Sequence, residues 1–311
     1  MTDSHDYLHK PVMVNEVSEL LNLSPGKVIV DCTVGGGGHT REILKRILPG
    51  GFLIGIDKDE DVLKETNKSM LLDSQFGSDA INGRTRNNFA FFHADYKDLD
   101  EVLNRAGKGG VDGVLLDLGV SSMQLERPER GFSFAKEGPL DMRMDRLSDV
   151  TAYDVLCRTS LKELEHIIRK FGEEPRARRI AMAIMQRRRK IGCLKTTSDL
   201  ADVIKEAVPF SRKKIHPATL TFQALRIVVN KELEHLESLL SRIHLFLKKG
   251  GRVVVISFHS LEDRIVKNIF RDGSKQGIVK ILTPRPLRPS ECEVRLNPRS
   301  RSAKLRASER I

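Results

Sequence analysis

The stretch Val28-Ile-Val-Asp-Cys-Thr-Val-Gly-Gly-Gly-Gly-His39 decides the fold. It predicts a buried strand, an acidic residue where the strand ends, and a glycine loop that opens a helix over residues 40–48. A second apolar strand, residues 51–56, ends at Asp57, nineteen residues after Gly38. An acidic side chain at about this distance from a glycine loop binds the hydroxyl pair of a ribose. The stretch therefore predicts a βαβ unit that holds a nucleoside.

The glycine loop distinguishes between two classes of nucleoside cofactor. A dinucleotide loop follows the pattern G-x-G-x-x-G, but its last glycine, counted from Gly35, falls on Thr40. Asp31 lies four residues before Gly35, where a carboxylate would repel a pyrophosphate and attract an ammonium group. S-adenosylmethionine carries an ammonium, a ribose and an adenine but no phosphate, so the pattern favours it over NAD. A turn without a ligand is disfavoured, because four adjacent glycines cost backbone entropy that a turn does not require.

Composition indicates a polyanionic partner. The chain has 311 residues and a formal net charge of +11, which points to nucleic acid or a membrane surface. It holds no apolar run long enough to cross a bilayer, so we expect no membrane span. The first residues are acidic and polar, unlike a signal or transit peptide, and this predicts a cytoplasmic protein.

The four cysteines are scattered and form no C-x-x-C pair. This spacing predicts reduced thiols, no zinc site and no requirement for a metal.

Further strands follow, each with polar residues where it ends. Residues 88–92 predict a third strand that leads to Asp95 and Tyr96, and residues 111–116 predict a fourth that leads to Asp117. A fifth covers residues 253–257. Ligands of parallel sheets bind at the carboxyl ends of the strands. We therefore expect Asp31, Asp57, Asp95, Tyr96 and Asp117 to converge on one crevice of a Rossmann-like α/β sheet flanked by helices.

The strand pattern is interrupted between the fourth and fifth strands. Residues 126–216 contain helical spacing only, which predicts an inserted all-helical domain. The sheet domain would then comprise residues 1–125 and 217–311. Within the insert, Ser198 is expected to cap a helix that ends near Val208. After it, Pro217 is expected at the first position of one long amphipathic helix that reaches residue 247.

Basic residues concentrate in the insert and near the end of the chain. Such groups bind phosphates and set affinity and register rather than sequence choice. We expect the two clusters together to contact RNA or DNA. The insert cluster comprises Arg176, Arg178, Arg179, Arg187, Arg188, Arg189 and Lys190. The terminal cluster comprises Arg285, Arg288, Arg295, Arg299, Arg301, Lys304, Arg306 and Arg310.

At the level of whole motifs the chain resembles the bacterial ribosomal small-subunit RNA methyltransferase H family, also called MraW. The resemblance runs in the family's order over nearly the whole chain. The glycine loop alone fits any class I methyltransferase, whereas the strings around residues 139–144 and 257–263 are more specific. The matching segments are His9-Lys-Pro-Val-Met13, Asp31-Cys-Thr-Val-Gly-Gly-Gly-Gly-His39, Leu116-Asp-Leu-Gly-Val-Ser-Ser122, Arg130-Gly-Phe-Ser-Phe134, Pro139-Leu-Asp-Met-Arg-Met144, Phe222-Gln-Ala-Leu-Arg226, Ser257-Phe-His-Ser-Leu-Glu-Asp263 and Asn297-Pro-Arg-Ser-Arg-Ser-Ala-Lys304.

The resemblance implies a class I S-adenosylmethionine-dependent methyltransferase with a helical insert. It implies methylation of the N4 amine of a cytidine in the decoding region of 16S ribosomal RNA, within the small ribosomal subunit. Asp31 joins the cofactor set on the charge argument above, and Tyr96 stands where some members have Phe. The cofactor contacts that carry over are Gly37, Gly38, His39, Asp57, Tyr96, Asp117 and Gln124.

Methyl transfer to an amine requires a proton acceptor. A cytosine amine is a poor nucleophile, because its lone pair is delocalised, and a base must take its proton. Many amino-methyltransferases place Asn-Pro-Pro-Tyr after the fourth strand, but here the sequence is Asp117-Leu-Gly-Val-Ser-Ser122. The candidates are Asp117, Asp141 and backbone carbonyls near Ser121.

Other residues of the matching segments suggest contacts with the substrate. His259 and Asp263 line the substrate side or, equally, cap and pack at the end of the fifth strand. Arg143, Arg299 and Arg301 are candidates to grip phosphate. The target base must be unpaired or splayed out, and Phe132 and Phe134 are candidates to stack on it, although this spacing is more typical of a core.

Three other functions are compatible with parts of the pattern. The acceptor could lie in DNA or protein, and only the family resemblance excludes DNA cytosine N4. An NAD-dependent oxidoreductase is disfavoured by Asp31 and the missing third glycine. A non-catalytic RNA-binding protein is disfavoured by the intact acidic residues and glycine loop.

Overall fold

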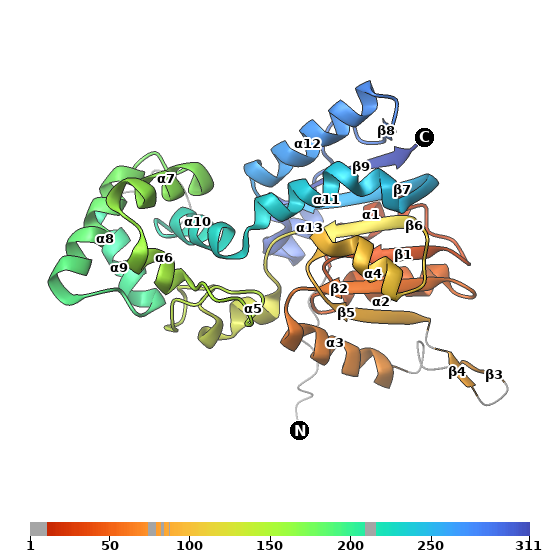
Figure 1. The fold of residues 1–311 in the computed structure, drawn as a ribbon, viewed down its shortest axis with the longest axis horizontal. Coiled ribbons are helices and arrows are strands. Elements are labelled where there is room, and N and C mark those ends of the chain that lie inside the picture. Colours follow the sequence, from red (N-terminus) through yellow and green to blue (C-terminus); the bar gives the residue numbers. More distant parts are fainter. Residues whose placement is uncertain (1–10, 74–78, 82–83, 87, 209–215) are drawn as a thin grey trace. The chain divides into compact units, whose positions relative to one another are not determined.

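The computed structural model describes residues 11–73, 79–81, 84–86, 88–208 and 216–311 (Figure 1). It groups into two compact units. The sheet unit comprises the described residues up to Gly119 together with Leu233–Ile311, and the helical unit comprises Val120–Glu232. Of the first matching segment, His9–Met13, His9 and Lys10 lie outside the described residues.

The sheet unit is built on seven strands in the order β5-β2-β1-β6-β7-β9-β8. The first five are parallel, whereas β9 is antiparallel to β7 and β8. This confirms the predicted α/β sheet. The strands are β1 (Val28–Asp31), β2 (Phe52–Asp57), β5 (Phe89–His93), β6 (Val111–Asp117), β7 (Leu247–Ser257), β8 (Val279–Ile281) and β9 (Lys304–Arg310), with a separate hairpin of β3 (Asp79–Ile81) and β4 (Arg84–Arg86).

Strand register brings the acidic strand ends to one edge of the sheet. Asp31 pairs with Gly55 and Leu115, and Asp57 pairs with His93. Because all of these strands run the same way, the side chains after β1, β2, β5 and β6 follow one edge.

Two helical layers cover the sheet. Side chains alternate between the faces of a strand, so Val253 and Val255 of β7 enter one core while Val254 and Ile256 enter the other. The first core takes in α4 (Leu99–Arg105), α11 (Glu232–Phe246) and α12 (Ser260–Lys275). The second takes in α1 (Val14–Leu20), α2 (Gly38–Ile47) and α3 (Glu60–Leu72).

The basic end of the chain is folded and ends in a strand of the sheet, where Lys304 and Arg306 form ion pairs within the fold. It contains α13 (Glu291–Leu296), a 3-10 turn η3 (Pro298–Ser302) and β9. In β9, Lys304 and Arg306 both pair with Asp263 of α12, at 3.1 and 2.7 Å. The sequence did not predict this strand because charged residues interrupt its apolar ones.

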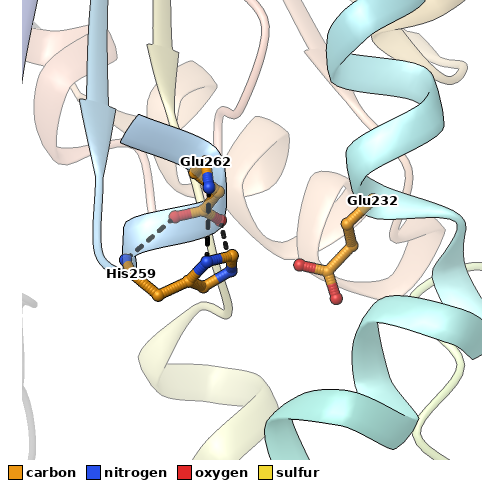
Figure 2. Close-up of side chains that lie close together, drawn as sticks. All are labelled: Glu232, His259 and Glu262. Atoms are coloured by element: carbon orange, nitrogen blue, oxygen red, sulfur yellow. Dashed lines mark hydrogen bonds and ion pairs between the residues drawn. The ribbon is translucent and has the colours of Figure 1, made fainter. Parts of the chain in front are cut away.

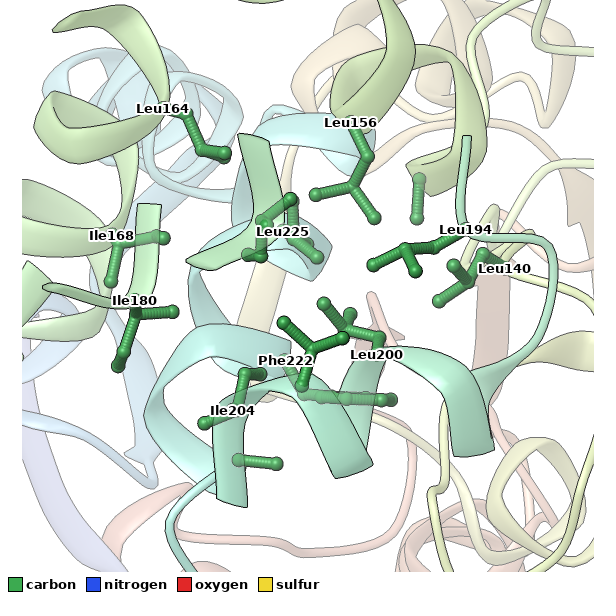
Figure 3. Close-up of a cluster of buried hydrophobic side chains, with 14 of the residues drawn as sticks. Leu140, Leu156, Leu164, Ile168, Ile180, Leu194, Leu200, Ile204, Phe222 and Leu225 are labelled. Carbon is green, nitrogen blue, oxygen red and sulfur yellow. The ribbon is translucent and has the colours of Figure 1, made fainter. Parts of the chain in front are cut away.

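The helical unit has its own core (Figure 3). Figure 3 shows apolar side chains from its helices meeting, among them Leu164, Ile180, Ile204, Phe222 and Leu225. Its elements are α5 (Ser122–Glu126), a 3-10 turn η2 (Pro128–Arg130), α6 (Ala152–Arg158), α7 (Leu161–Gly172), α8 (Ala177–Ile191), α9 (Thr197–Ala207) and α10 (Thr219–Asn230).

The predicted long helix at the end of the insert is two helices. Lys231 has φ 52°, a left-handed conformation that ends α10, and residue 247 already belongs to β7. Asn230 at the end of α10 donates to the carbonyl of Met142 at 2.7 Å, which ties this helix to the helical unit. Pro217 precedes the cap residue Ala218 instead of opening the helix.

Two smaller predictions about the insert were also wrong. Thr196, not Ser198, caps α9, and it forms a reciprocal capping box with Asp199. The structure joins Cys157 and Cys193 in a disulfide with a Cα–Cα distance of 5.6 Å, whereas all four cysteines were expected as thiols. The two cysteines are 36 residues apart in the sequence, and Arg188 of α8 also reaches this place by donating to the carbonyl of Cys157 at 2.9 Å.

None of the described helices combines the length and the apolar composition needed to cross a bilayer.

Candidate active site

The glycine loop follows β1 and is held from two sides. The amide of Gly35 donates to Asp57 Oδ2 at 2.8 Å, and Thr66 Oγ1 of α3 donates to the Gly35 carbonyl at 2.6 Å. Gly37 has φ +76°, and a Cβ there would lie 2.7 Å from Thr66 Cγ2. A side chain at this position would therefore be strained and would also clash. The loop is a cradle in which backbone atoms can approach a ligand.

Asp31 lies beneath the loop and is fully buried. Its carboxylate accepts from Thr40 Oγ1 at 2.7 Å and from the amide of Thr33 at 3.1 Å. Burial raises the pKa of Asp31, although both hydrogen bonds act in the opposite direction. Asp31 therefore shapes the loop, while contact with a cofactor ammonium stays a prediction.

Asp57 ends β2 and connects the loop with the next turn. Besides the Gly35 amide, its carboxylate accepts from the amide of Asp59 at 2.9 Å. Burial raises the pKa of Asp57 to about 6, although the two amides oppose that shift. Each carboxylate oxygen has further acceptor capacity. The group can therefore hold a ribose hydroxyl pair when it is ionised.

Asp117, at the end of β6, faces His39 in the first turn of α2. His39 Nε2 lies 3.5 Å from Asp117 Oδ2, and His39 is only 6% exposed. Neither His39 Nε2 nor Asp117 Oδ1 has a hydrogen-bond partner within the described chain, although both atoms are buried. Burial alone would lower the pKa of His39, but the Asp117 and Asp31 carboxylates outweigh it and raise that pKa. The structure thus brings these two sequence-distant residues together.

Asp95 and Tyr96 follow β5, as expected. Tyr96 begins a 3-10 turn, η1 (Tyr96–Asp98), and is packed against the core shared with α11. Asp95 is engaged by Lys58 Nζ at 2.8 Å and His235 Nδ1 at 2.6 Å. Burial disfavours the charged form of Asp95, but these two groups outweigh it and hold its pKa well below its usual range.

Three predicted site residues belong to the helical unit. Gln124 is buried and caps its own helix, where its Oε1 accepts from the amide of Ser121 at 3.0 Å. Asp141 and Arg143 form a two-point ion pair, with Nε–Oδ1 and Nη2–Oδ2 distances of 2.8 Å each. Burial would raise the pKa of Asp141, but Arg143 outweighs it and lowers that pKa. Arg143 also donates to the carbonyl of Ser148 at 2.7 Å, so its guanidinium already serves this turn.

His259 and Asp263 begin α12, where the structure favours the capping alternative. Figure 2 shows the His259 ring against the Glu262 carboxylate, 3.2 Å from Nε2 to Oε1. His259 Nδ1 accepts from the Glu262 amide at 3.4 Å, and Glu262 Oε2 accepts from the His259 amide at 3.2 Å. Burial would raise the pKa of Asp263, but Arg306 and Lys304 outweigh it and lower that pKa.

The candidate stacking residues are also packed within the helical unit. Phe132 is buried in its core. Phe134 stacks on His216 with ring centroids 4.5 Å apart and meets Phe222 edge-on at 5.0 Å. A role for either ring against a substrate base stays a prediction.

Some members of the basic clusters have named partners within the fold, and many members are exposed. Arg176 pairs with Glu174 at 2.9 Å, and Arg187 pairs with Glu206 at 3.1 Å. Arg188 donates to three backbone carbonyls at the end of α6, at 2.8 to 3.0 Å. The exposed members are Arg178, Arg179, Arg189 and Lys190 on α8, and Arg285, Arg288, Arg295, Arg299 and Arg301 near the end of the chain.

The backbone and polar groups of the sheet unit suit S-adenosylmethionine. The loop offers a close backbone approach at Gly37, and Gly38 is packed so tightly that a Cβ would lie 3.0 Å from Pro11. Asp57 offers acceptors for hydroxyls, while His39 Nε2 and Asp117 Oδ1 are buried polar atoms still to be satisfied. Buried polar groups are normally hydrogen-bonded, so these two atoms are compatible with a polar ligand in the cradle.

Residues 6–311 match the family model described as the MraW methylase family. The chain belongs to the MraW methylase family. A relative from Thermotoga neapolitana, named ribosomal RNA small subunit methyltransferase H, is 51% identical over 99% of this chain and 97% of its own. Relatives of the same name from Persephonella marina and Caldicellulosiruptor saccharolyticus are 47% and 43% identical. They match 97% and 98% of this chain, and 99% and 100% of their own lengths.

Membership in the family confirms the resemblance and, with it, the class of reaction. The protein is an RNA methyltransferase that methylates ribosomal RNA with S-adenosylmethionine as its methyl donor. The predictions of an enzyme and of this cofactor are confirmed.

Sequence reasoning missed the side chains that support the site. Thr40, Thr66, Lys58 and His235 hold the cradle or its neighbouring turn. Lys58 directly follows Asp57, so its position was a usable signal. The contact of His235 on α11 with Asp95 left no pattern in the sequence, because 140 residues separate the two along the chain.

Proposed function

We propose that this enzyme methylates the N4 amine of one cytidine in the decoding region of 16S ribosomal RNA, on the small ribosomal subunit. The names of the relatives support the small-subunit substrate. The amine chemistry is supported by a carboxylate, Asp117, in the position that amino-methyltransferases reserve for the group facing the acceptor. This substrate also implies the cytoplasm as the place of the reaction.

Asp117 is the best candidate for the proton acceptor, and its buried, unsatisfied Oδ1 carries this proposal. The amine nitrogen must lose one proton for each methyl group it gains. A carboxylate oxygen directed at the N–H draws electron density to that nitrogen and then takes the proton. Asp141 is less suited, because Arg143 occupies both of its oxygens and lowers its pKa.

His39 lies beside this carboxylate. Its Nε2 is 3.5 Å from Asp117 Oδ2, and the Asp117 and Asp31 carboxylates raise the pKa of His39. Asp57 would hold the ribose, and Tyr96 would place a flat ring against the adenine. When bound, S-adenosylmethionine supplies a methyl group activated by a sulfonium, so the protein mainly aligns donor and acceptor.

The helical unit is proposed as the substrate-recognition domain. Its exposed basic side chains on α8 suit phosphate contacts, which set affinity and register on the RNA. The exposed arginines near the end of the chain, including Arg299 and Arg301, extend the proposed set of phosphate contacts.

Methyl transfer tests the proposal. Labelled S-adenosylmethionine is supplied with small subunits from cells that lack this methylation, and the labelled nucleoside is identified by mass spectrometry. N4-methylcytidine at one position supports the proposal, whereas label on another atom, in another RNA or in DNA overturns it. Asp117→Asn should lower kcat by about a hundredfold or more, while Asp141→Asn should change it much less. Equal losses in both variants would refute Asp117 as the acceptor.

A further inference from the structure

Three ionisable side chains from three elements meet beside the cofactor cradle. Lys58 follows β2, Asp95 follows β5, and His235 lies on α11. Lys58 Nζ and His235 Nδ1 both contact Asp95 Oδ2, at 2.8 and 2.6 Å. The side chains are only 20%, 10% and 14% exposed, in that order. The sequence pattern places Asp95 at the crevice, but neither it nor the proposed reaction assigns a role to Lys58 or His235.

A second contact from α11 holds the same turn. Arg242 Nη2 donates to the carbonyl of Lys97 at 2.7 Å, and Arg242 Nη1 lies 3.7 Å from Asp100 Oδ2. His235 and Arg242 are seven residues apart, so they lie on one face of the helix. One helix, α11, therefore contacts the turn between Asp95 and Asp100 near both of its ends.

This turn contains Tyr96. Asp95 Oδ1 accepts from the amide of Lys97 at 3.1 Å, so the carboxylate bound by His235 also caps the turn that Tyr96 begins. On the other side, the amide of Ala94 donates to the Asp57 carbonyl at 3.2 Å. A displacement of Asp95 would consequently move Tyr96 relative to Asp57.

We propose that His235 is a positioning residue which, through Asp95, fixes the turn bearing Tyr96 and so sets the affinity for the nucleoside part of S-adenosylmethionine. The inference rests on the proposed cofactor roles of Asp57 and Tyr96. His235 lies on α11, which begins at Glu232, the last residue of the helical unit in the sequence.

Attachment of α11 to the sheet does not require this cluster. Leu236, Leu239, Leu240 and Ile243 of α11 are buried in the core of the sheet unit. Desolvating an ion pair costs free energy that its mutual attraction only partly offsets, so such a cluster adds little to stability in itself. Its contacts from Lys58 and His235 instead hold the Asp95 carboxylate in one position.

Variants of His235 separate positioning from packing. The side chain of His235→Ala cannot donate to Asp95, whereas that of His235→Asn retains an N–H donor near the place of Nδ1. Glu237→Ala, on an exposed position of the same helix, is the matched control. The dissociation constant for S-adenosylmethionine is measured by calorimetry, thermal unfolding is recorded without cofactor, and KM and kcat are measured on small ribosomal subunits.

We expect His235→Ala to raise the dissociation constant and the KM for S-adenosylmethionine about tenfold, with kcat at saturation within about twofold. His235→Asn should restore most of the affinity, and Glu237→Ala should match the wild type. Arg242→Ala, which removes a partly exposed side chain, should weaken binding severalfold and keeps the test open if His235→Ala does not fold.

Tyr96→Ala separates the two levels of the proposal. If it weakens binding while folded His235→Ala binds like the wild type, the positioning role is overturned and the cofactor assignment stands. Failure of His235→Asn to rescue binding would likewise reduce His235 to a packing residue. Unchanged binding by Tyr96→Ala would overturn both the cofactor role of Tyr96 and the positioning of its turn.

Discussion

Lowering the pH through 6 is expected to weaken binding of S-adenosylmethionine through Asp57. Burial raises the pKa of this carboxyl to about 6, so the protonated form dominates below that pH. A ribose hydroxyl pair needs the ionised carboxylate as acceptor. The affinity for S-adenosylmethionine should therefore reach its maximum above pH 7 and decline as the pH falls through 6.

The magnitude follows from the fraction of Asp57 that is ionised. One pH unit below a pKa of about 6, roughly one carboxyl in ten remains charged. If only that form binds the ribose, the apparent dissociation constant at pH 5 should be about ten times its value at pH 7.5. In Asp57→Asn this acid limb should disappear, and affinity at neutral pH should fall by about tenfold or more.

Calorimetry at half-unit steps between pH 5 and 7.5 measures this dependence, with thermal unfolding at each pH as a check on folding. The Asp117 and Asp31 carboxylates raise the pKa of His39, and this side chain is unchanged in Asp57→Asn. Asp31 also has a raised pKa but is retained in Asp57→Asn, which makes this variant the control. A dissociation constant that is flat with pH, or an acid limb that persists in Asp57→Asn, would refute the reasoning.

Three further predictions concern stability and RNA binding. Gly37→Ala should lower the free energy of unfolding by about 1–3 kcal/mol, measured by denaturant titration, because it combines a positive φ with the clash against Thr66. The double variant Arg178→Glu, Arg179→Glu should weaken RNA binding and lower the salt dependence of the affinity by about two phosphate contacts; an unchanged slope would remove α8 from the RNA surface. Arg188→Ala should instead lower the melting temperature, since it leaves three carbonyls of α6 without their donor, and it should leave the salt slope unaltered.

The fold was predictable wherever one short-range rule acts alone. Apolar runs predicted β1, β2, β5, β6 and the second half of β7, because a buried parallel strand needs continuous apolar side chains. The rule fails at β9, where Arg306 is buried only because Asp263 of α12 neutralises it. It fails again at Lys231, whose left-handed backbone ends a helix that the apolar periodicity continues.

The sequence by itself determined the class of the protein and the acidic strand ends of its site, because apolar runs, the acids that end them and the glycine loop are formed by neighbouring residues. Only the tertiary structure decided which ionisable side chains contact one another. It placed His39 of α2 beside Asp117 of β6, and it paired Asp141 with Arg143. It also recruited His235 to Asp95 from a helix 140 residues away. Electrostatic partnerships depend on distances of a few ångströms in space, and no periodicity in the sequence encodes those distances.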